Sequence, residues 1–192
     1  TLEKLARQRG FELISLTKSA CPGPAVKKVE TGKYKNDDCS AWRLNSVKRI
    51  KSIHPDAVIV SGMQHFEVPS GYSSREAWWR EGQIKTFALL RGSSPHIIYL
   101  SDTPHPNRDI PSCIAAGKLE RCNGSERSTP IFAGAYQKID PTSWLCQRNC
   151  PAIVNGVVAY RDSSHLTVAM ARALSPQLAG ALTQLGVFSS SK

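Results

Sequence analysis

Short apolar runs alternate with stretches of helical periodicity, and this alternation is the feature that most restricts the fold of the chain. Residues 56–62 and 96–101 each carry a continuous apolar run, as strands buried on both faces do. Residues 11–16 and 157–160 are predicted to form two further strands. Strands that alternate with helices favour a parallel sheet with helices on both faces.

The helical segments lie between these runs. The first ends at Gly10, the second is ended by Pro55, and Ser73-Ser74-Arg75-Glu76 is a capping box that opens the third. We predict Trp78 and Trp79 of the third helix to line the core or a groove. The full set of predicted helical segments is residues 1–9, 41–53, 73–91, 112–118, 129–138 and 166–174, with a restart at Ser175-Pro176.

Size and composition favour one globular domain over residues 1–192, because 41% of the 192 residues are hydrophobic. The formal charge of +10 favours anionic partners such as acidic glycans, lipid head groups or nucleic acid. The basic residues are scattered along helical stretches and are not interleaved with aromatic residues. This pattern is typical of a solvated helix face, so nucleic acid is not expected as a partner.

The chain has six cysteines and no C-x-x-C motif, so no metal site is expected. Disulfides formed in an oxidising compartment fit the even number better, and six free thiols in a cytosolic protein are the alternative. The residues contain no signal peptide and no apolar run of about 18 residues, so export would depend on an upstream segment. The simplest connectivity joins neighbours, as Cys21–Cys39, Cys113–Cys122 and Cys146–Cys150.

The motif with the clearest chemistry is D-x-x-H, formed by Asp162 and His165 just after the last predicted strand. A carboxylate three residues before an imidazole can hold one ring nitrogen while the other faces a cleft, as in the orienting half of a hydrolase triad. The alternative is helix capping, because Asp, Ser and His are also common where helices begin.

Other polar residues follow the remaining predicted strands. In parallel sheets, sites lie beyond the carboxyl ends of the strands, so these loops are expected to converge with the D-x-x-H. The candidates for substrate contact are Ser19, His65 and His105.

Three motifs together resemble the SGNH-like domain found at the carboxyl end of bacterial membrane acyltransferases of the acyltransferase-3 family. They are S-x-C-P at residues 19–22, C-x-x-W-R at residues 39–43, and D-x-x-H-L-T at residues 162–167. The resemblance covers essentially the whole chain in order. It implies a three-layer α/β/α, flavodoxin-like fold with a mainly parallel sheet.

The resemblance also implies an activity. The domain would be extracytoplasmic, in the periplasm or cell envelope, tethered through an upstream segment to an integral-membrane acyltransferase portion of the same polypeptide. It would take part in O-acyl transfer, for example acetyl transfer, to a cell-surface glycan or glycolipid, without a cofactor. His165 would be the general base and Asp162 its orienting acid. Gly62 and Gln64 would form the oxyanion site in place of the family's G-x-N, and a surface glutamine is the alternative reading of Gln64.

The chain departs from this family at the nucleophile. The family's G-D-S-H block is absent from all 192 residues. We therefore expect the first strand and the nucleophilic serine to lie upstream of Thr1, so that the residues given are catalytically incomplete. The chain's own serines are poor replacements for that nucleophile because none lies in a glycine-flanked turn of the nucleophile-elbow type. They are Ser19, Ser61, Ser101, Ser163 and Ser164.

Two other functions stay open: a secreted carbohydrate or lipid esterase of the same fold, and a non-catalytic glycan-binding module.

Overall fold

The computed structural model describes residues 1–30, 36–106, 108–117, 119–124, 129–134, 136–147 and 149–188. The chain divides into two compact units: unit 1 is Thr1–Ile14, Thr103–Thr129 and Asp140–Lys192, and unit 2 is Ser15–Asp102 and Pro130–Ile139. The elements in chain order are α1 (Leu2–Arg9), α2 (Asn36–Ile53), β1 (Ala57–Ser61), α3 (Arg75–Leu90), β2 (His96–Leu100), α4 (Ile110–Ala115), the 3-10 helix η1 (Leu119–Cys122), β3 (Gln137–Ile139), α5 (Thr142–Leu145), β4 (Ile153–Val154), β5 (Val157–Val158), α6 (Val168–Ala173) and α7 (Ser175–Gln184).

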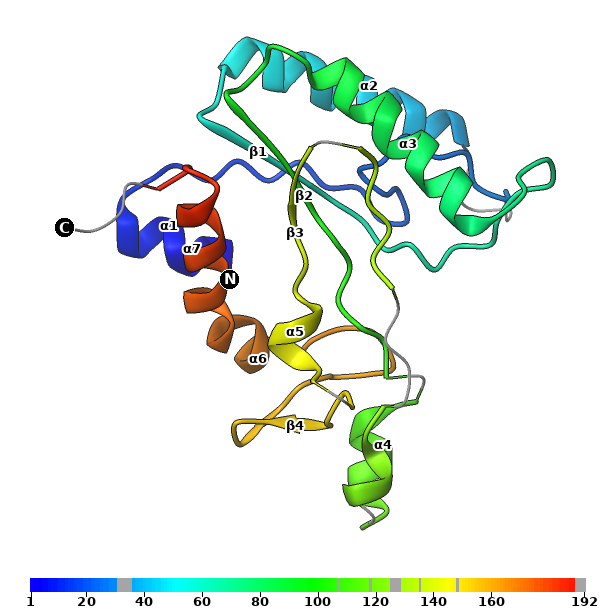
Figure 1. Ribbon diagram of the computed structural model, residues 1–192, viewed down its shortest axis with the longest axis vertical. Helices are drawn as coiled ribbons and strands as arrows, with labels where there is room; N and C mark the ends of the chain where they lie inside the picture. Colours follow the sequence, from blue (N-terminus) through cyan, green and yellow to red (C-terminus); the bar gives the residue numbers. More distant parts are fainter. Residues whose placement is uncertain are drawn as a thin grey trace. The chain divides into compact units, whose positions relative to one another are not determined.

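Unit 2 contains a parallel sheet in the order β1-β2-β3 (Figure 1). In its register Ala57 lies opposite His96, and Ile98 lies opposite Gln137. The apolar runs of β1 and β2 thus form the parallel strands that their sequences predict. Helices α2 and α3 lie side by side and contact each other (Figure 1).

Helix α3 begins where the capping box predicts. The Ser74 side chain accepts a hydrogen bond from the Ala77 backbone N–H, which satisfies one of the donors left free at a helix start. Trp78 and Trp79 are fully buried, so the prediction of core tryptophans is confirmed. The indole N–H of Trp79 donates to the Tyr99 hydroxyl at 2.9 Å, which links α3 to β2. Around this link, α3 and the sheet bury a common core of Val58, Val60, Phe87, Leu90 and Tyr99.

Two elements predicted from the sequence, residues 11–16 and residues 129–138, are wrong. Residues 11–16 form no strand in the part of the chain that the structure describes, and Leu13 and Ile14 are 36% and 41% exposed. An apolar run favours an extended chain, but a strand also needs a paired neighbour for its backbone groups.

The predicted helix at residues 129–138 is also wrong, since its last residues form β3. Upstream of β3 the backbone hydrogen-bonds to a side chain instead of to itself. Gln83 Nε2 donates to the Ile131 carbonyl at 2.7 Å, and Gln83 Oε1 accepts from the Ala133 N–H at 2.6 Å. Gly134, at φ +58°, then turns the chain into β3.

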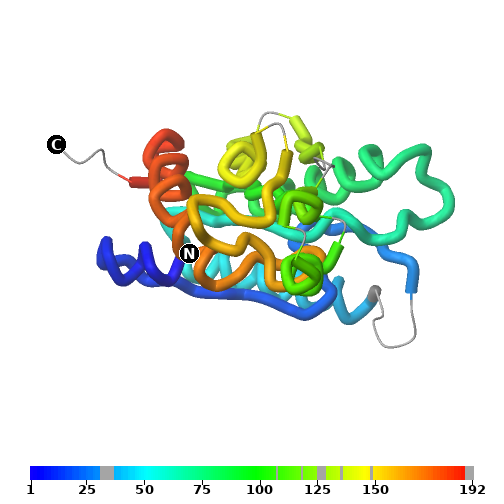
Figure 2. The backbone as a smooth tube through the Cα atoms, turned by 90° about the horizontal axis from the view of Figure 1, so that it is seen from below, coloured from blue at the N-terminus to red at the C-terminus, as the bar shows by residue number. Residues whose placement is uncertain are grey.

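Unit 1 brings the first helix and the last helix of the described residues together. Helices α1 and α7 are in contact, as the tube in Figure 2 also shows, and the Arg9 guanidinium lies over the Phe188 ring at 4.6 Å from its centre. The Thr1 hydroxyl donates a hydrogen bond to the carbonyl of Ala171, which belongs to α6. No helix among the described residues is long and apolar enough to cross a membrane.

The predicted strand at residues 157–160 is shorter than expected and is antiparallel. Val157 and Val158 form β5, which pairs with β4 in a two-stranded hairpin. Asn155 and Gly156 connect the strands with φ values of +49° and +77°. An Asn-Gly pair between apolar residues is a strong signal for a tight hairpin turn, and it is the signal from which this pairing could have been predicted.

All six cysteines form disulfides, in the neighbour pairing that the sequence predicts: Cys21–Cys39, Cys113–Cys122 and Cys146–Cys150. The free-thiol alternative is therefore wrong. The second and third disulfides belong to the core of unit 1, which also contains Ile110, Ala159, Tyr160 and Met170. Covalent links of this kind are typical of proteins from oxidising compartments.

Candidate functional site

The D-x-x-H motif lies in a short closed loop of unit 1. Tyr160 and Leu166 face each other in an antiparallel bridge, and the Arg161 N–H donates to the His165 carbonyl at 2.9 Å. The five residues 161–165 therefore form a tight loop that connects the two paired residues Tyr160 and Leu166. Tyr160 is fully buried and anchors the loop at its base, while the His165 side chain, at the residue where the loop closes, is 62% exposed.

Asp162 uses both carboxylate oxygens within this loop. Oδ1 accepts from the backbone N–H groups of Ser164 and His165 at 2.8 and 2.7 Å, and Oδ2 lies 2.8 Å from His165 Nδ1. The N–H groups of His165 and Ser164, followed by the hydrogen bond from the His165 ring, hold the pKa of Asp162 well below its ordinary value. Asp162 is thus ionised at neutral pH and can only accept hydrogen bonds.

The state of the imidazole follows from this contact. Since the ionised carboxylate only accepts, Nδ1 of His165 must carry the proton, and in the neutral ring the lone pair then lies on Nε2. An imidazole held in this tautomer has the arrangement that a general base needs. The Ser164 hydroxyl, 3.3 Å from the same Nδ1, is a weaker second neighbour.

The helix-capping alternative for Asp162 is wrong. Helix α6 is capped by Thr167, whose hydroxyl oxygen accepts from the Met170 N–H at 3.0 Å. Asp162 instead binds the two N–H groups of its own loop, five residues before that cap. Its carboxylate contacts the His165 ring and does not cap the helix.

The residues predicted for an oxyanion site lie after β1 in unit 2. Gly62 packs so tightly that a Cβ atom there would lie 2.8 Å from Pro22 Cβ. Gln64 is only 3% exposed, so the surface-glutamine alternative is wrong. Its side-chain Oε1 accepts a long hydrogen bond of 3.4 Å from the Ile131 N–H, and its carbonyl accepts from Arg75 at 2.8 Å.

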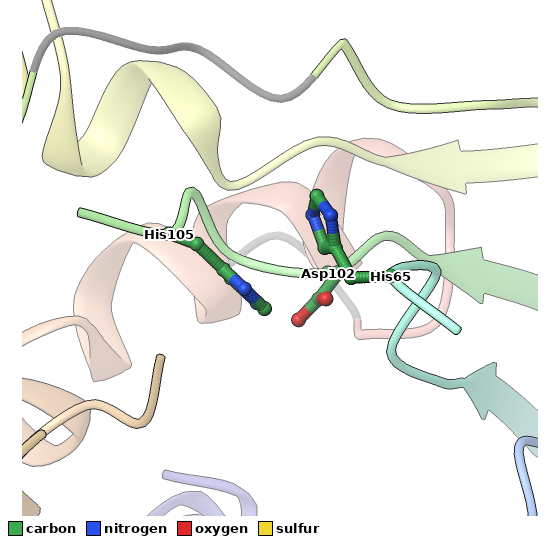
Figure 3. Close-up of side chains that lie close together, drawn as sticks. All are labelled: His65, Asp102 and His105. Carbon is green, nitrogen blue, oxygen red and sulfur yellow. The ribbon is translucent and has the colours of Figure 1, made fainter. Parts of the chain in front are cut away.

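His65 and Asp102 follow β1 and β2 in the same unit, and Figure 3 shows their side chains close together. Their potential ligand atoms lie within 4.8 Å of one another. His105 comes three residues after Asp102 but belongs to unit 1, and Ser19 is exposed in unit 2. Asp102 is not among the site residues predicted from the sequence, although a carboxylate at a strand's carboxyl end is the signal that would have found it.

The structure brings some of these loops together. The segment after Leu16 meets the end of β1, because the Gly23 N–H donates to the Ser61 carbonyl at 3.1 Å. Arg43 donates to the Pro22 carbonyl at 3.3 Å, and its burial lowers the pKa of its guanidinium. Asp162 and His165 belong to unit 1, whereas Ser19, Gly62, Gln64 and His65 belong to unit 2.

Comparison with known proteins agrees with this architecture. The chain is similar in structure to the periplasmic domain of a lipopolysaccharide acetyltransferase from Salmonella ser. Paratyphi A, with a TM-score of 0.70 and 14% identity over 95% of this chain and 77% of that chain. This likeness confirms the α/β fold class. No curated protein matches the chain. A family model described as an SGNH domain fused to AT3 domains matches residues 1–180, and the chain therefore belongs to that family.

Proposed function

We propose that this domain takes part in O-acyl transfer to a cell-surface glycan or glycolipid, with His165 as the general base. The observation that carries the proposal is the 2.8 Å contact between His165 Nδ1 and Asp162 Oδ2 on an exposed loop. Family membership supports the class of chemistry, since the family's domains are fused to AT3 domains. The similar Salmonella domain comes from a lipopolysaccharide acetyltransferase.

The mechanism is covalent catalysis by a serine. His165 Nε2 takes the proton of a serine hydroxyl as the serine oxygen attacks an acyl carbonyl, and Asp162 stabilises the resulting imidazolium. The acyl group forms an ester with the serine, and the leaving group of the acyl donor departs with the proton from His165. A sugar hydroxyl then attacks this ester and His165 takes up its proton. His165 returns that proton to the serine oxygen as the bond between this oxygen and the acyl group breaks.

The oxyanion that forms in each attack needs hydrogen-bond donors. We propose the backbone N–H of Gly62 and the side-chain amide of Gln64 for this role. The burial of Gln64 supports the proposal, because a donor held in place by its surroundings stabilises an oxyanion better than a mobile one. Ser19, His65 and His105 are proposed as contacts to the substrate.

The serine is proposed to lie in a segment outside these 192 residues, because no G-D-S occurs among them. An integral-membrane acyltransferase portion of the same polypeptide would supply the acyl group and hold the domain at the membrane. The three disulfides fit an extracytoplasmic domain. A formal charge of +10 suits a glycan or lipid acceptor that carries anionic groups.

The test uses the domain joined to its upstream protein in membranes, supplied with an acyl donor and the cell's own surface glycan. His165→Asn should reduce acyl transfer by roughly 100-fold or more, since it removes the general base. His54→Asn is the matched control, because His54 is exposed and its φ of +51° is one that Asn tolerates. Equal activity of both variants and of the wild type would refute the proposed role and favour a glycan-binding module.

The reaction product separates transfer from hydrolysis. A transferase yields an acylated glycan, whereas an esterase yields free acid from an acylated glycan. Release of acid alone, with His165 still required, would move the domain to the esterase class and leave the base assignment intact.

A further inference from the structure

We propose that Thr167 is the positioning residue that holds His165 against Asp162, an inference that rests on the proposed role of His165. Thr167 lies two residues after His165, at the junction of the D-x-x-H loop and α6. It does not contact the reacting atoms in the scheme above. Its effect would come through the backbone that carries the imidazole.

The His165 ring depends on its loop for orientation. Its side chain is 62% exposed, and in the part of unit 1 that the structure describes its hydrogen-bond partners are Asp162 and Ser164. Both partners belong to the same five-residue loop, so neither ties the loop to the rest of the unit. The position of the loop must therefore be fixed where it joins the strand and the helix.

Thr167 makes that junction with four hydrogen bonds. Its N–H donates to the Ala159 carbonyl at 2.9 Å, and its hydroxyl donates to the Val158 carbonyl at 2.7 Å. The same hydroxyl accepts from the Met170 N–H at 3.0 Å, and the Thr167 carbonyl accepts from the Ala171 N–H at 2.9 Å. Two of these hydrogen bonds thus connect Thr167 to the strand segment that precedes the loop, and the other two connect it to α6, which follows the loop.

The side chain is suited to this double contact. A hydroxyl can donate one hydrogen bond and accept another, so Thr167 can serve the strand carbonyl and the helix N–H at the same time. The strand side is itself anchored, since Ala159 is fully buried and its N–H donates to the Ala152 carbonyl at 2.8 Å. On the helix side, Met170 is 1% exposed. Thr167 therefore joins two buried anchors across the base of an exposed loop.

The primary test measures the imidazole tautomer by 15N NMR on the 192-residue chain, without any catalytic assay. The wild type should show one tautomer with the proton on Nδ1 of His165. Thr167→Val keeps the branched shape but removes the hydroxyl, so the two ring-nitrogen shifts should move toward each other as the tautomers mix. Thr167→Ser keeps the hydroxyl and should restore the wild-type spectrum.

Thr183→Val is the matched control, because the Thr183 hydroxyl also bonds a backbone carbonyl in unit 1, that of Ala179, away from the loop. It should leave the His165 spectrum unchanged. A wild-type spectrum in Thr167→Val would overturn the proposal, as would a failure of Thr167→Ser to restore the shifts.

If Thr167→Val does not fold, amide hydrogen exchange of the wild-type protein tests the positioning role of Thr167 instead. The proposal requires the Arg161 N–H, which closes the loop, to be protected as strongly as the Ala171 N–H of α6. Exchange of Arg161 at the rate of an unprotected peptide would overturn it.

In the membrane-joined protein, Thr167→Val should lower kcat by roughly 10- to 100-fold with KM unchanged, because a displaced base affects the chemical step more than binding. If the wild-type protein shows no acyl chemistry, the proposed function fails, and the NMR result still decides the positioning role.

Discussion

At the scale of single residues, Asp162 is held mainly by backbone groups. Two N–H groups and one imidazole surround a carboxylate whose side chain is 38% exposed. Hydrogen bonds to the charged form favour ionisation, so the folded protein lowers the pKa of Asp162. The carboxylate therefore stays charged under acidic conditions in which an ordinary aspartate would be protonated.

This shift predicts how acid acts on stability. Below the ordinary pKa of 3.8, the unfolded chain binds a proton at Asp162 that the folded chain does not bind, so stability contributed by this group falls as pH falls. In Asp162→Asn this contribution is absent at every pH. We expect the melting temperature of the wild type to exceed that of Asp162→Asn near pH 7, and the difference to shrink below about pH 4. A difference that stays constant from pH 7 to pH 2 would contradict the assignment.

The Asp162–His165 contact could be predicted from the sequence because both partners lie in one short loop. A three-residue spacing leaves few geometries, and a carboxylate beside an imidazole favours contact. The burial of Gln64 could not be predicted in the same way. The Gln64 side chain accepts a hydrogen bond from the Ile131 N–H, which is 67 residues away in the chain, and a local pattern carries no information about such a distant neighbour.

At the scale of elements, the end of β1 is fixed by the segment from Cys21 to Val26. Gly23 donates to the Ser61 carbonyl, and the disulfide to Cys39 holds one end of the segment to α2. Arg43, also from α2, donates to the carbonyls of Pro22 and Val26. The motifs S-x-C-P and C-x-x-W-R are therefore parts of one contact that supports the loop of Gly62.

This packing predicts that Gly62→Ala is destabilising. The added Cβ would lie 2.8 Å from Pro22 Cβ and 3.2 Å from the Gly23 nitrogen, and the disulfide and Arg43 restrain the segment from moving away. Over-packing of this kind costs about 1–3 kcal/mol in the free energy of unfolding. The control is Gly180→Ala in α7, where the added Cβ would meet nothing within 4 Å beyond the helix's own backbone and alanine should stabilise the helix by about 0.5–1 kcal/mol. Equal unfolding midpoints in denaturant for the two variants would contradict this account.

The strands and helices were predictable where periodicity and capping agreed. For α3, the Ser74 cap and the buried tryptophans both fit the sequence pattern. The predicted helix over residues 129–138 is wrong because tertiary contacts of this segment outweigh its helical composition. The Gln83 side chain binds two backbone groups of that segment, and a local pattern carries no information about a partner 48 to 50 residues away.

At the scale of the whole molecule, the family match over residues 1–180 spans both compact units. Each unit has its own disulfides: Cys21–Cys39 lies in unit 2, and the other two lie in unit 1. Each unit also has its own buried core. The covalent links thus stabilise the two units separately, and their contributions can be measured separately.

Loop length predicts which disulfide contributes most to the free energy of unfolding. A disulfide restricts the unfolded chain more when it closes a longer loop, and the separations are 18 residues for Cys21–Cys39 and 4 for Cys146–Cys150. The chain-entropy relation gives about 3 kcal/mol for the first and about 2 kcal/mol for the second. Replacing both cysteines of each pair by serine should therefore lower the denaturant midpoint more for Cys21 and Cys39. Thiol counting verifies that the remaining disulfides of each variant are intact. A larger loss from the Cys146 and Cys150 pair would show that its buried position in the core of unit 1, and not loop length, determines its contribution.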